Sequence, residues 1–267
     1  MDDVENWSPE QEYRLGGFGA RRSVDVHCHC LPGLDDGPDS VEDSIALCEA
    51  LVADGITTVI ATPHQLGRYD RENSAAEVRQ VVELLYAELK DREIPLEIFA
   101  GGDVRVDERL PELIESGHIG TAADAGQHIL LELPHELFVD ALPIIAKLRE
   151  NGIQTILTHP ERHPYLQGRD RWLRGCLEQG AVLQITAGSL LGDFGRRAFE
   201  EAWRLVLAGM VGIIATDAHD AVRHPPRMTE AIRVLTLKIG ADATRLLVIE
   251  NPLRVIDGQP IPSLDAF

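Results

Sequence analysis

Side chains that can bind divalent metal ions recur in short clusters along this sequence. They are imidazoles and carboxylates, several of them beside Thr, Pro or Gly. The clusters are His27-Cys28-His29, Asp35-Asp36, Thr62-Pro63-His64, Gly101-Gly102-Asp103, Glu132, Thr158-His159-Pro160-Glu161-Arg162 and Thr216-Asp217-Ala218-His219. A mixed nitrogen and oxygen set suits Mn, Fe or Zn, and it holds more imidazole than Ca or Mg sites use. Such ions act as Lewis acids and acidify bound water.

Taken singly, most of these clusters have an ordinary structural explanation. A His-x-His pair on a strand puts both rings on one face, and Asp35-Asp36-Gly37 is a turn sequence. Glu132 is harder to explain in this way, because it lies in the apolar run Ile129–Leu133, where an unpaired carboxylate is costly. Only the joint placement of the clusters makes a metal site the better interpretation.

Predicted strands place these clusters on one face of the protein. The short β-branched runs are Val24–His27, Ile56–Ala61, Leu96–Ala100, His128–Leu133, Ile153–Thr158, Ala181–Ile185 and Val211–Ala215. Six of these seven runs end at or just before His, Asp or Glu. The chemistry of a β/α barrel lies at the carboxyl ends of its strands, so this pattern favours a barrel over an open doubly wound sheet.

Segments with helical periodicity separate the predicted strands, as a parallel α/β fold requires. Two of them begin at capping sequences, Ser40 with Asp43 and Ser74 with Glu77. The other predicted helices are Val139–Glu150, Ala198–Ala208, Thr229–Ile239 and Asp242–Ile249.

Composition narrows the class of protein. The chain has 267 residues, with 25 Lys and Arg against 44 Asp and Glu, and its net charge is −19. This charge argues against a nucleic-acid or anionic-membrane partner. The sequence predicts no signal peptide and no membrane span, so we expect a cytoplasmic protein. Residues 1–22 are expected to form a flexible N-terminal extension and residues 23–267 a single domain, while the oligomeric state cannot be read from the sequence.

The four cysteines do not support a cysteine-based mechanism. They are Cys28, Cys30, Cys48 and Cys176, too few to indicate a disulfide framework. A phosphatase loop built on a cysteine needs Arg six positions later, and those positions hold Leu34, Asp36, Asp54 and Val182. The cysteines are therefore interpreted as small packed hydrophobic residues. The sequence also lacks the glycine-rich loops that bind nucleotides.

The clusters together resemble a known family from about Val24 to Pro260. The segment from Asp25 to Pro38 is similar to the opening motif of the polymerase-and-histidinol-phosphatase (PHP) superfamily. It is more closely similar to the manganese-dependent protein-tyrosine phosphatases of bacterial capsule and exopolysaccharide operons. Further matching segments are Ala61–His64, Thr158–Arg162, Gln184–Ser189, Thr216–His219, Pro225–Met228 and Asn251-Pro252.

The resemblance implies a distorted seven-stranded (β/α)7 TIM-like barrel, the PHP fold, with two to three ions of Mn (or Fe or Zn). By motif, one ion would be held by His27, His29, Asp103 and Asp217. A second would be held by Asp103 as a bridge, Glu132 and His159, and a third by Asp36, His64 and His219. Arg162 would bind phosphoryl oxygens.

Two positions depart from the family pattern. The family usually has Glu where this chain has Asp103, and a carboxylate shorter by one methylene reaches less far between two ions. The second phosphate-binding arginine of the family aligns with His224, with Arg223 beside it. Arg223 or His224 would then complete the phosphate site, and a role for His224 would make binding depend on pH.

The activity that the resemblance implies is hydrolysis of phosphotyrosine in a protein, with a bacterial tyrosine kinase of polysaccharide synthesis as the expected substrate. Attack by a metal-bound hydroxide is expected, with Glu161 orienting Arg162 or His159. Three alternatives stay open: a phosphatase for a small metabolite such as histidinol phosphate, a nuclease, and a non-catalytic scaffold of the polysaccharide machinery. The negative charge counts against the nuclease.

Overall fold

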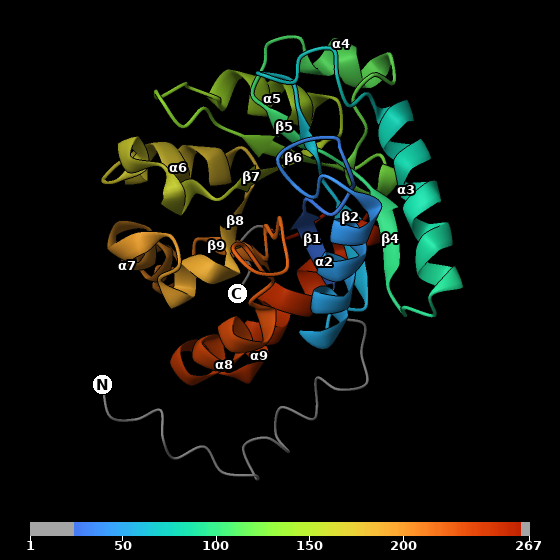
Figure 1. Ribbon diagram of the computed structural model, residues 1–267. Helices are drawn as coiled ribbons and strands as arrows, with labels where there is room; N and C mark the ends of the chain where they lie inside the picture. Colours follow the sequence, from blue (N-terminus) through green and yellow to red (C-terminus); the bar gives the residue numbers. More distant parts are fainter. Residues whose placement is uncertain (1–23, 263–267) are drawn as a thin grey trace.

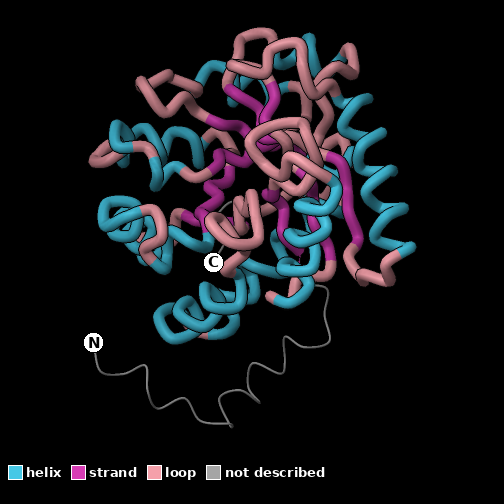
Figure 2. The backbone as a smooth tube through the Cα atoms, viewed as in Figure 1, coloured by secondary structure: helices cyan, strands magenta, loops and turns pink. Residues whose placement is uncertain are grey.

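Parallel strands alternate with helices in the computed structural model, which describes residues 24–262. The strands lie in the interior and the helices surround them (Figures 1 and 2). The strands are β1 (Val24–Cys28), β2 (Thr58–Ala61), β3 (His64–Gln65), β4 (Glu97–Ala100), β5 (Asp103–Arg105), β6 (His128–Glu132), β7 (Gln154–Thr158), β8 (Val182–Thr186) and β9 (Val211–Ala215). All seven predicted strands are confirmed, with ends that differ by at most two residues. The predicted extension 1–22 lies outside the described residues.

The strands pair in two sheets, and every pair within them is parallel. One sheet has the order β1-β2-β4 and the other has the order β3-β5-β6-β7-β8-β9. The first and last strands meet at their carboxyl ends, where the His29 N–H donates to Ala218 O at 2.8 Å and the Asp217 N–H donates to His27 O at 2.8 Å. The predicted parallel α/β class is confirmed.

The short strands β3 and β5 were not predicted, and both begin after a break. β3 follows β2 across Thr62-Pro63, and β5 follows β4 across Gly101-Gly102. Pro63 has no N–H to donate to a neighbouring strand. A Cβ at Gly101 would lie 2.6 Å from Ile60 Cγ2, so the backbone passes where a side chain would not fit. The runs of β-branched residues stop at both breaks, which is why β3 and β5 were not predicted.

Gly102 gives a test of this close approach. A Cβ there would lie 2.7 Å from Cδ of the buried Gln65, so we expect Gly102→Ala to destabilise the fold by about 1–3 kcal/mol through overpacking. Urea unfolding measures the effect. Gly175→Ala is the matched control, because its Cβ would meet Leu142 at an ordinary 3.4 Å inside a helix and should be neutral or stabilising. Equal midpoints for Gly102→Ala and the unmodified chain would contradict the prediction.

The helices confirm both predicted capping sequences. The Ser40 side chain accepts from the Asp43 N–H, and Ser74 and Glu77 form a complete capping box. The helices are α2 (Val41–Ala53), α3 (Ala75–Asp91), α4 (Leu110–Glu115), α5 (Leu142–Glu150), α6 (Asp170–Glu178), α7 (Gly195–Leu207), α8 (Met228–Ile239), α9 (Ala241–Arg245) and α10 (Asn251–Ile256). No helix among residues 24–262 is long and apolar enough to cross a membrane.

Two helices, α4 and α6, were not predicted, and neither has a side-chain cap at its start. One predicted helix needs correction. The predicted helix Asp242–Ile249 is instead α9, a π-helical segment Leu246–Glu250, and α10. The predicted helix ended too early, at Ile249. The helical path continues into α10, because Pro252 lies at the start of that helix, where proline is well tolerated.

The buried side chains of the strands separate into two clusters. Val26, Leu130, Ile156 and Ile213 belong to a smaller cluster, while alternate residues such as Leu131 pack in the larger cluster. Alternation of this kind puts one set inside the strands and the other against the helices. Both faces of the strands are thus buried, which leaves the carboxyl ends and their loops for the site.

Candidate metal centre

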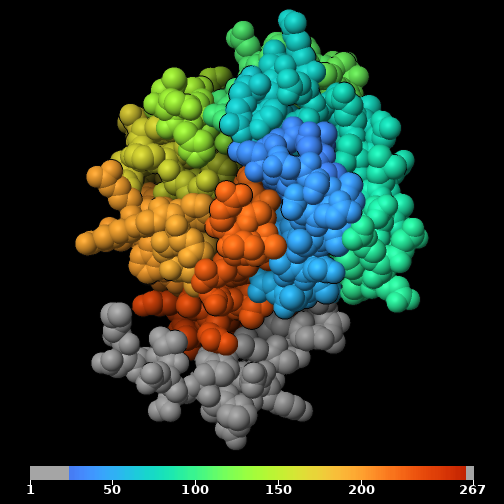
Figure 3. Space-filling model, in the orientation of Figure 1, coloured from blue at the N-terminus to red at the C-terminus, as the bar shows by residue number. Residues whose placement is uncertain are grey.

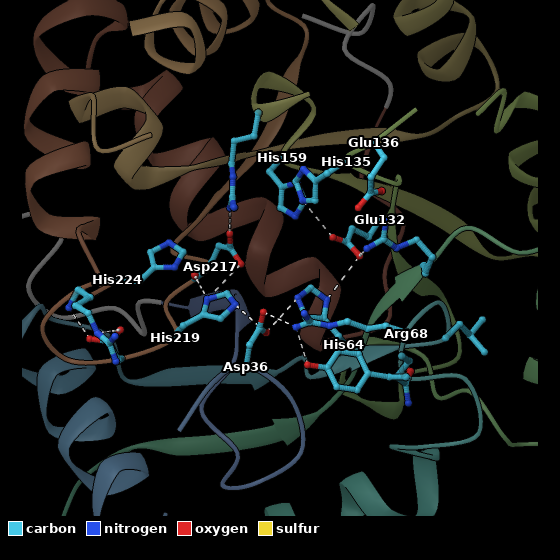
Figure 4. Close-up of a pocket in the computed structure, with 17 residues that line it drawn as sticks. Asp36, His64, Arg68, Glu132, His135, Glu136, His159, Asp217, His219 and His224 are labelled. Carbon is cyan, nitrogen blue, oxygen red and sulfur yellow. Dashed lines mark hydrogen bonds and ion pairs between the residues drawn. The ribbon is translucent and has the colours of Figure 1, made fainter. Parts of the chain in front are cut away.

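The loops after the strands meet on one face of the protein. In Figure 3 the blue segment after β1 lies beside the orange segment after β9, in agreement with a distance of 3.6 Å between Asp36 Oδ1 and His219 Nε2. Figure 4 shows the imidazoles and carboxylates of these loops pointing toward one another. They come from at least five different strand ends, so sheet pairing brings together residues far apart in sequence.

The first group of possible ligands is His27, His29 and Asp217, all buried. Asp217 Oδ1 lies 3.2 Å from His27 Nε2 and 3.4 Å from His29 Nε2. The two Nε2 atoms are 3.2 Å apart. Asp103 Oδ2 lies 3.7 Å from His27 Nε2, but Asp103 shares no group with His29 or Asp217, so the structure gathers three of the four residues expected for one ion.

The far ring nitrogens of the histidines are held by other groups. His27 Nδ1 is 2.8 Å from Gln184 Oε1, and His29 Nδ1 is 2.6 Å from Asp35 Oδ2. His219 Nδ1 donates to Asp217 O at 2.8 Å. Contacts of this kind fix the tautomer and the orientation of a ligating ring, here with each Nε2 facing the other donors.

Asp103 belongs to two further groups. One contains His27, Asp103 and His159, and the other contains His64, Asp103 and Glu132. Its Oδ2 lies 3.8 Å from His159 Nε2 and 3.5 Å from His64 Nδ1. Glu132 and His159 do not share a group, so the expected second set is only partly gathered. The central place of Asp103 agrees with the bridging role expected for it.

A fourth group contains His29, Asp36, His64 and His219. Asp36 Oδ1 lies 3.5 Å from His64 Nε2 and 3.6 Å from His219 Nε2. The structure therefore gathers Asp36, His64 and His219 as expected, and adds His29, which the sequence placed only in the first set.

The ionisation of these groups suits metal binding. Burial lowers the pKa of His27 to about 4, which leaves this imidazole neutral at pH 7. Burial opposes the charged form of Asp217, but His27 and Arg162 outweigh it and hold the pKa of Asp217 well below its ordinary value. Burial also disfavours protonated His29, but Asp35 and Asp217 outweigh it and raise the pKa of His29 well above the ordinary value. His29 is the exception among these groups, because an ion could bind its ring only after the ring had lost this proton.

Two site residues have an unusual backbone. His159 has φ of 32° and Asp217 has φ of 54°, both in the left-handed region. Residues other than glycine are uncommon there, and the cost is of order 1–3 kcal/mol each. The Asp25 carboxylate stabilises the turn at Asp217, because it accepts from the Thr216 N–H at 2.9 Å. Burial raises the pKa of Asp25 to about 7.

Arg162 lies at the edge of the first group, as expected for a residue that would bind phosphoryl oxygens. It forms an ion pair with Asp217 and lies 4.3 Å from the Phe194 ring. The expectation that Glu161 orients Arg162 or His159 is wrong. Glu161 Oε1 instead accepts from the Thr186 N–H at 3.0 Å and from Ser189 Oγ at 2.7 Å, and so holds the loop after β8.

His224 and Arg223 occupy different surroundings. The His224 ring stacks on His219 at 4.7 Å, and burial lowers its pKa to about 4. His224 is therefore neutral at pH 7 and cannot supply a fixed positive charge. The Arg223 side chain is 91% exposed, and its Nε lies 4.0 Å from Asp220 Oδ2.

These groups surround a pocket of about 520 Å³ (Figure 4). Several polar lining residues were not predicted, among them Arg68, Tyr69, Arg105, His135 and Glu136. Arg105 carried a usable signal, because it follows Asp103 by two residues on a strand and so shares its face. The others lie in loops where the sequence shows no pattern.

The residues present fit a divalent transition metal. The donors are imidazole nitrogens and carboxylate oxygens from several strands. Asp103 Oδ2 and His64 Nδ1 are buried polar atoms without a hydrogen-bond partner, which a cation would satisfy. All four cysteines are buried and free, so none is placed to act as a nucleophile.

Known proteins resemble this chain over most of its length. It is 33% identical to the tyrosine-protein phosphatase YwqE of Bacillus subtilis, over 89% of this chain and 93% of that protein. It is 25% identical to the tyrosine-protein phosphatase CpsB of Streptococcus pneumoniae, over 89% of this chain and the whole of that protein.

Solved structures also resemble this chain. A crystal structure from a study of YwqE and CpsB, described there as unique metal-dependent tyrosine phosphatases, matches with a TM-score of 0.85 and 31% identity, over 90% of this chain and 96% of that one. A Lactococcus lactis histidinol phosphate phosphatase matches with a TM-score of 0.51 and 17% identity, covering 83% of this chain and 95% of that one, which shows a shared fold alone.

The family model for capsular polysaccharide synthesis proteins CpsB/CapC matches residues 23–257, nearly all of the described chain. This chain therefore belongs to the CpsB/CapC family.

Proposed function

We propose that this protein is a metal-dependent phosphomonoester hydrolase that removes phosphate from phosphotyrosine in proteins. The observation that carries the proposal is the convergence of four overlapping donor groups at one pocket, which is lined by members of each group and by Arg162. The relatives YwqE and CpsB, named tyrosine-protein phosphatases, support the choice of substrate.

The proposed metal ligands are the nine residues expected from the sequence: His27, His29, Asp36, His64, Asp103, Glu132, His159, Asp217 and His219. Mn is the proposed ion, with Fe or Zn as alternatives and two to three ions per chain. Bound ions would neutralise charge on the phosphoryl group and lower the pKa of a water. Asp103 shares one group with His159 and another with Glu132, but Glu132 and His159 do not share a group. This separation supports weaker metal binding at the site that Glu132 and His159 would form.

Arg162 binds the phosphoryl oxygens in this proposal. Its planar fork of N–H donors suits two oxygens at once, and stacking on Phe194 limits its side-chain freedom. His224 stands at the second phosphate position as a neutral hydrogen-bonding group. Arg223 at the rim contacts the part of the substrate beyond the phosphate.

We also infer that the two sheets form one distorted seven-stranded barrel. Counting β2 with β3 and β4 with β5 as two broken strands gives seven. The hydrogen bonds of His29 and Asp217 join the first strand to the last. The separate cluster of inward side chains, among them Val26 and Leu130, supports the same arrangement.

The test of the substrate class compares phosphotyrosine peptide with histidinol phosphate on Mn-loaded protein. We expect kcat/KM to be at least about tenfold higher for the peptide, because a phenol with a pKa of about 10 leaves more readily than an alkoxide. Faster hydrolysis of histidinol phosphate would favour the metabolite phosphatase, and degradation of an oligonucleotide would favour the nuclease. No hydrolysis in folded, metal-loaded protein would favour the scaffold.

The expected partner is a bacterial tyrosine kinase of capsule or exopolysaccharide synthesis. The family description, capsular polysaccharide synthesis, supports this choice. The cytoplasmic location stays a prediction.

A further inference from the structure

Arg105 lines the pocket and has no part in the reaction proposed above. It is the last residue of β5, and it stands directly opposite Glu132 in the pairing of β5 with β6. Asp103 lies two residues earlier on the same strand, so both side chains leave the same face. The register of one strand pair thus sets Arg105 beside a proposed metal ligand.

The guanidinium of Arg105 makes two contacts that together fix this part of β6. Its Nη2 lies 2.9 Å from Glu132 Oε2, and its Nη1 donates to Leu133 O at 3.2 Å. The Glu132 side chain is 3% exposed and that of Arg105 is 24% exposed. A buried carboxylate that loses its charged partner is costly, so this pair contributes more than a surface pair would.

The stem of Arg105 is also held in place. Gly67 packs against it so closely that a Cβ on Gly67 would lie 3.2 Å from Arg105 Cγ. Gly67 has φ of 57°, a conformation that glycine adopts easily. The loop after β3 therefore covers the aliphatic part of Arg105 and leaves its guanidinium facing Glu132.

Three of the proposed carboxylate ligands, Asp36, Glu132 and Asp217, each contact an arginine of the pocket. Asp217 pairs with Arg162, and Asp36 Oδ2 lies 2.7 Å from Arg68 Nη2. In Asp36 and Asp217 the other oxygen faces imidazole nitrogens. Partners that hydrogen-bond a ligating carboxylate orient it and strengthen metal binding. The pair of Arg105 with Glu132 is more deeply buried than the pair of Arg68 with Asp36, since Arg68 is 62% exposed.

We propose that Arg105 is a positioning residue that holds the Glu132 carboxylate in the orientation required for metal binding. The inference rests on the proposed function, because it takes Glu132 as a metal ligand. Arg105 acts through Glu132 and not through contact with the substrate. It therefore affects metal affinity, whereas a residue that binds the substrate anion affects KM.

The experiment measures Mn²⁺ affinity directly, by the electron paramagnetic resonance signal of free Mn²⁺, in the full chain. We expect Arg105→Gln to weaken the affected Mn²⁺ site by about 10–100-fold. At saturating Mn²⁺ the KM for p-nitrophenyl phosphate should change by less than about threefold. Arg105→Lys should be intermediate, because an ammonium keeps the charge but cannot match the fork.

Arg109→Gln is the matched control. Arg109 is half-exposed, pairs with Asp70 and Asp107, and does not line this pocket. It should keep the Mn²⁺ affinity of the unmodified chain. Circular dichroism and thermal unfolding confirm that each variant is folded before its affinity is compared.

Two results would overturn the inference while leaving the proposed function intact. One is unchanged Mn²⁺ affinity with a raised KM in Arg105→Gln, which would make Arg105 a substrate-binding residue. The other is no change in either quantity. Failure of the unmodified protein to bind Mn²⁺ or hydrolyse the ester would overturn both proposals together.

Discussion

We expect chelation of divalent metal ions to lower the hydrolysis of p-nitrophenyl phosphate by at least about 10³-fold, and Mn²⁺, Fe²⁺ or Zn²⁺ added back singly to restore it. The physical reason is the charge of the pocket. Without cations, Asp36, Asp103 and Asp217 oppose an anionic ester, since the pKa of each carboxyl lies below its ordinary value. Rates after each addition show which ion the site prefers.

The control for chelation is alkylation with iodoacetamide. Cys28, Cys30, Cys48 and Cys176 are buried and free, so alkylation of native protein should leave turnover unchanged. Loss of activity with full metal content after alkylation would contradict the metal mechanism. His27→Ala should lose metal measured by mass spectrometry. His128 is a buried histidine at the start of β6, at the opposite end from Glu132. His128→Ala should keep its bound metal.

We expect Arg162→Ala to lower kcat/KM for aryl phosphates by about 10²–10³-fold, or about 3–4 kcal/mol of transition-state stabilisation. The guanidinium is the proposed ligand of the phosphoryl oxygens, and no other arginine lies against Asp217 among the ion pairs of residues 24–262. Arg162→Lys should recover part of the loss, because it keeps the charge without the fork. Steady-state kinetics at saturating Mn²⁺ measure both variants.

Arg169→Ala is a close match for Arg162→Ala. Arg169 lies 4.2 Å from the Phe138 ring, much as Arg162 lies 4.3 Å from Phe194, but it is outside the pocket. Its removal should change kcat/KM by less than about twofold. Metal content must also be measured, because Arg162 contacts Asp217. A large loss of bound metal in Arg162→Ala would show that its effect comes from the metal site and not from phosphate binding.

Sequence reasoning worked best where a local rule decides the structure. The capping residues Ser40 and Ser74 stand where the helices begin, because a side-chain oxygen there satisfies a free backbone N–H. The β-branched runs form parallel strands, because strands that are buried on both faces consist of continuous apolar residues. Strands β3 and β5 were missed, since they are extended by pairing with neighbours and not by their own composition.

The sequence by itself determined the types of donor, their places at strand ends and the family motifs. These depend on alternation along a strand and on residue chemistry, which are local. Only the tertiary structure decided that His29 lies with Asp36, that Glu161 holds Ser189, and that Arg105 faces Glu132. Such contacts depend on strand register and loop path, and a shift of one residue would turn these side chains to the opposite face.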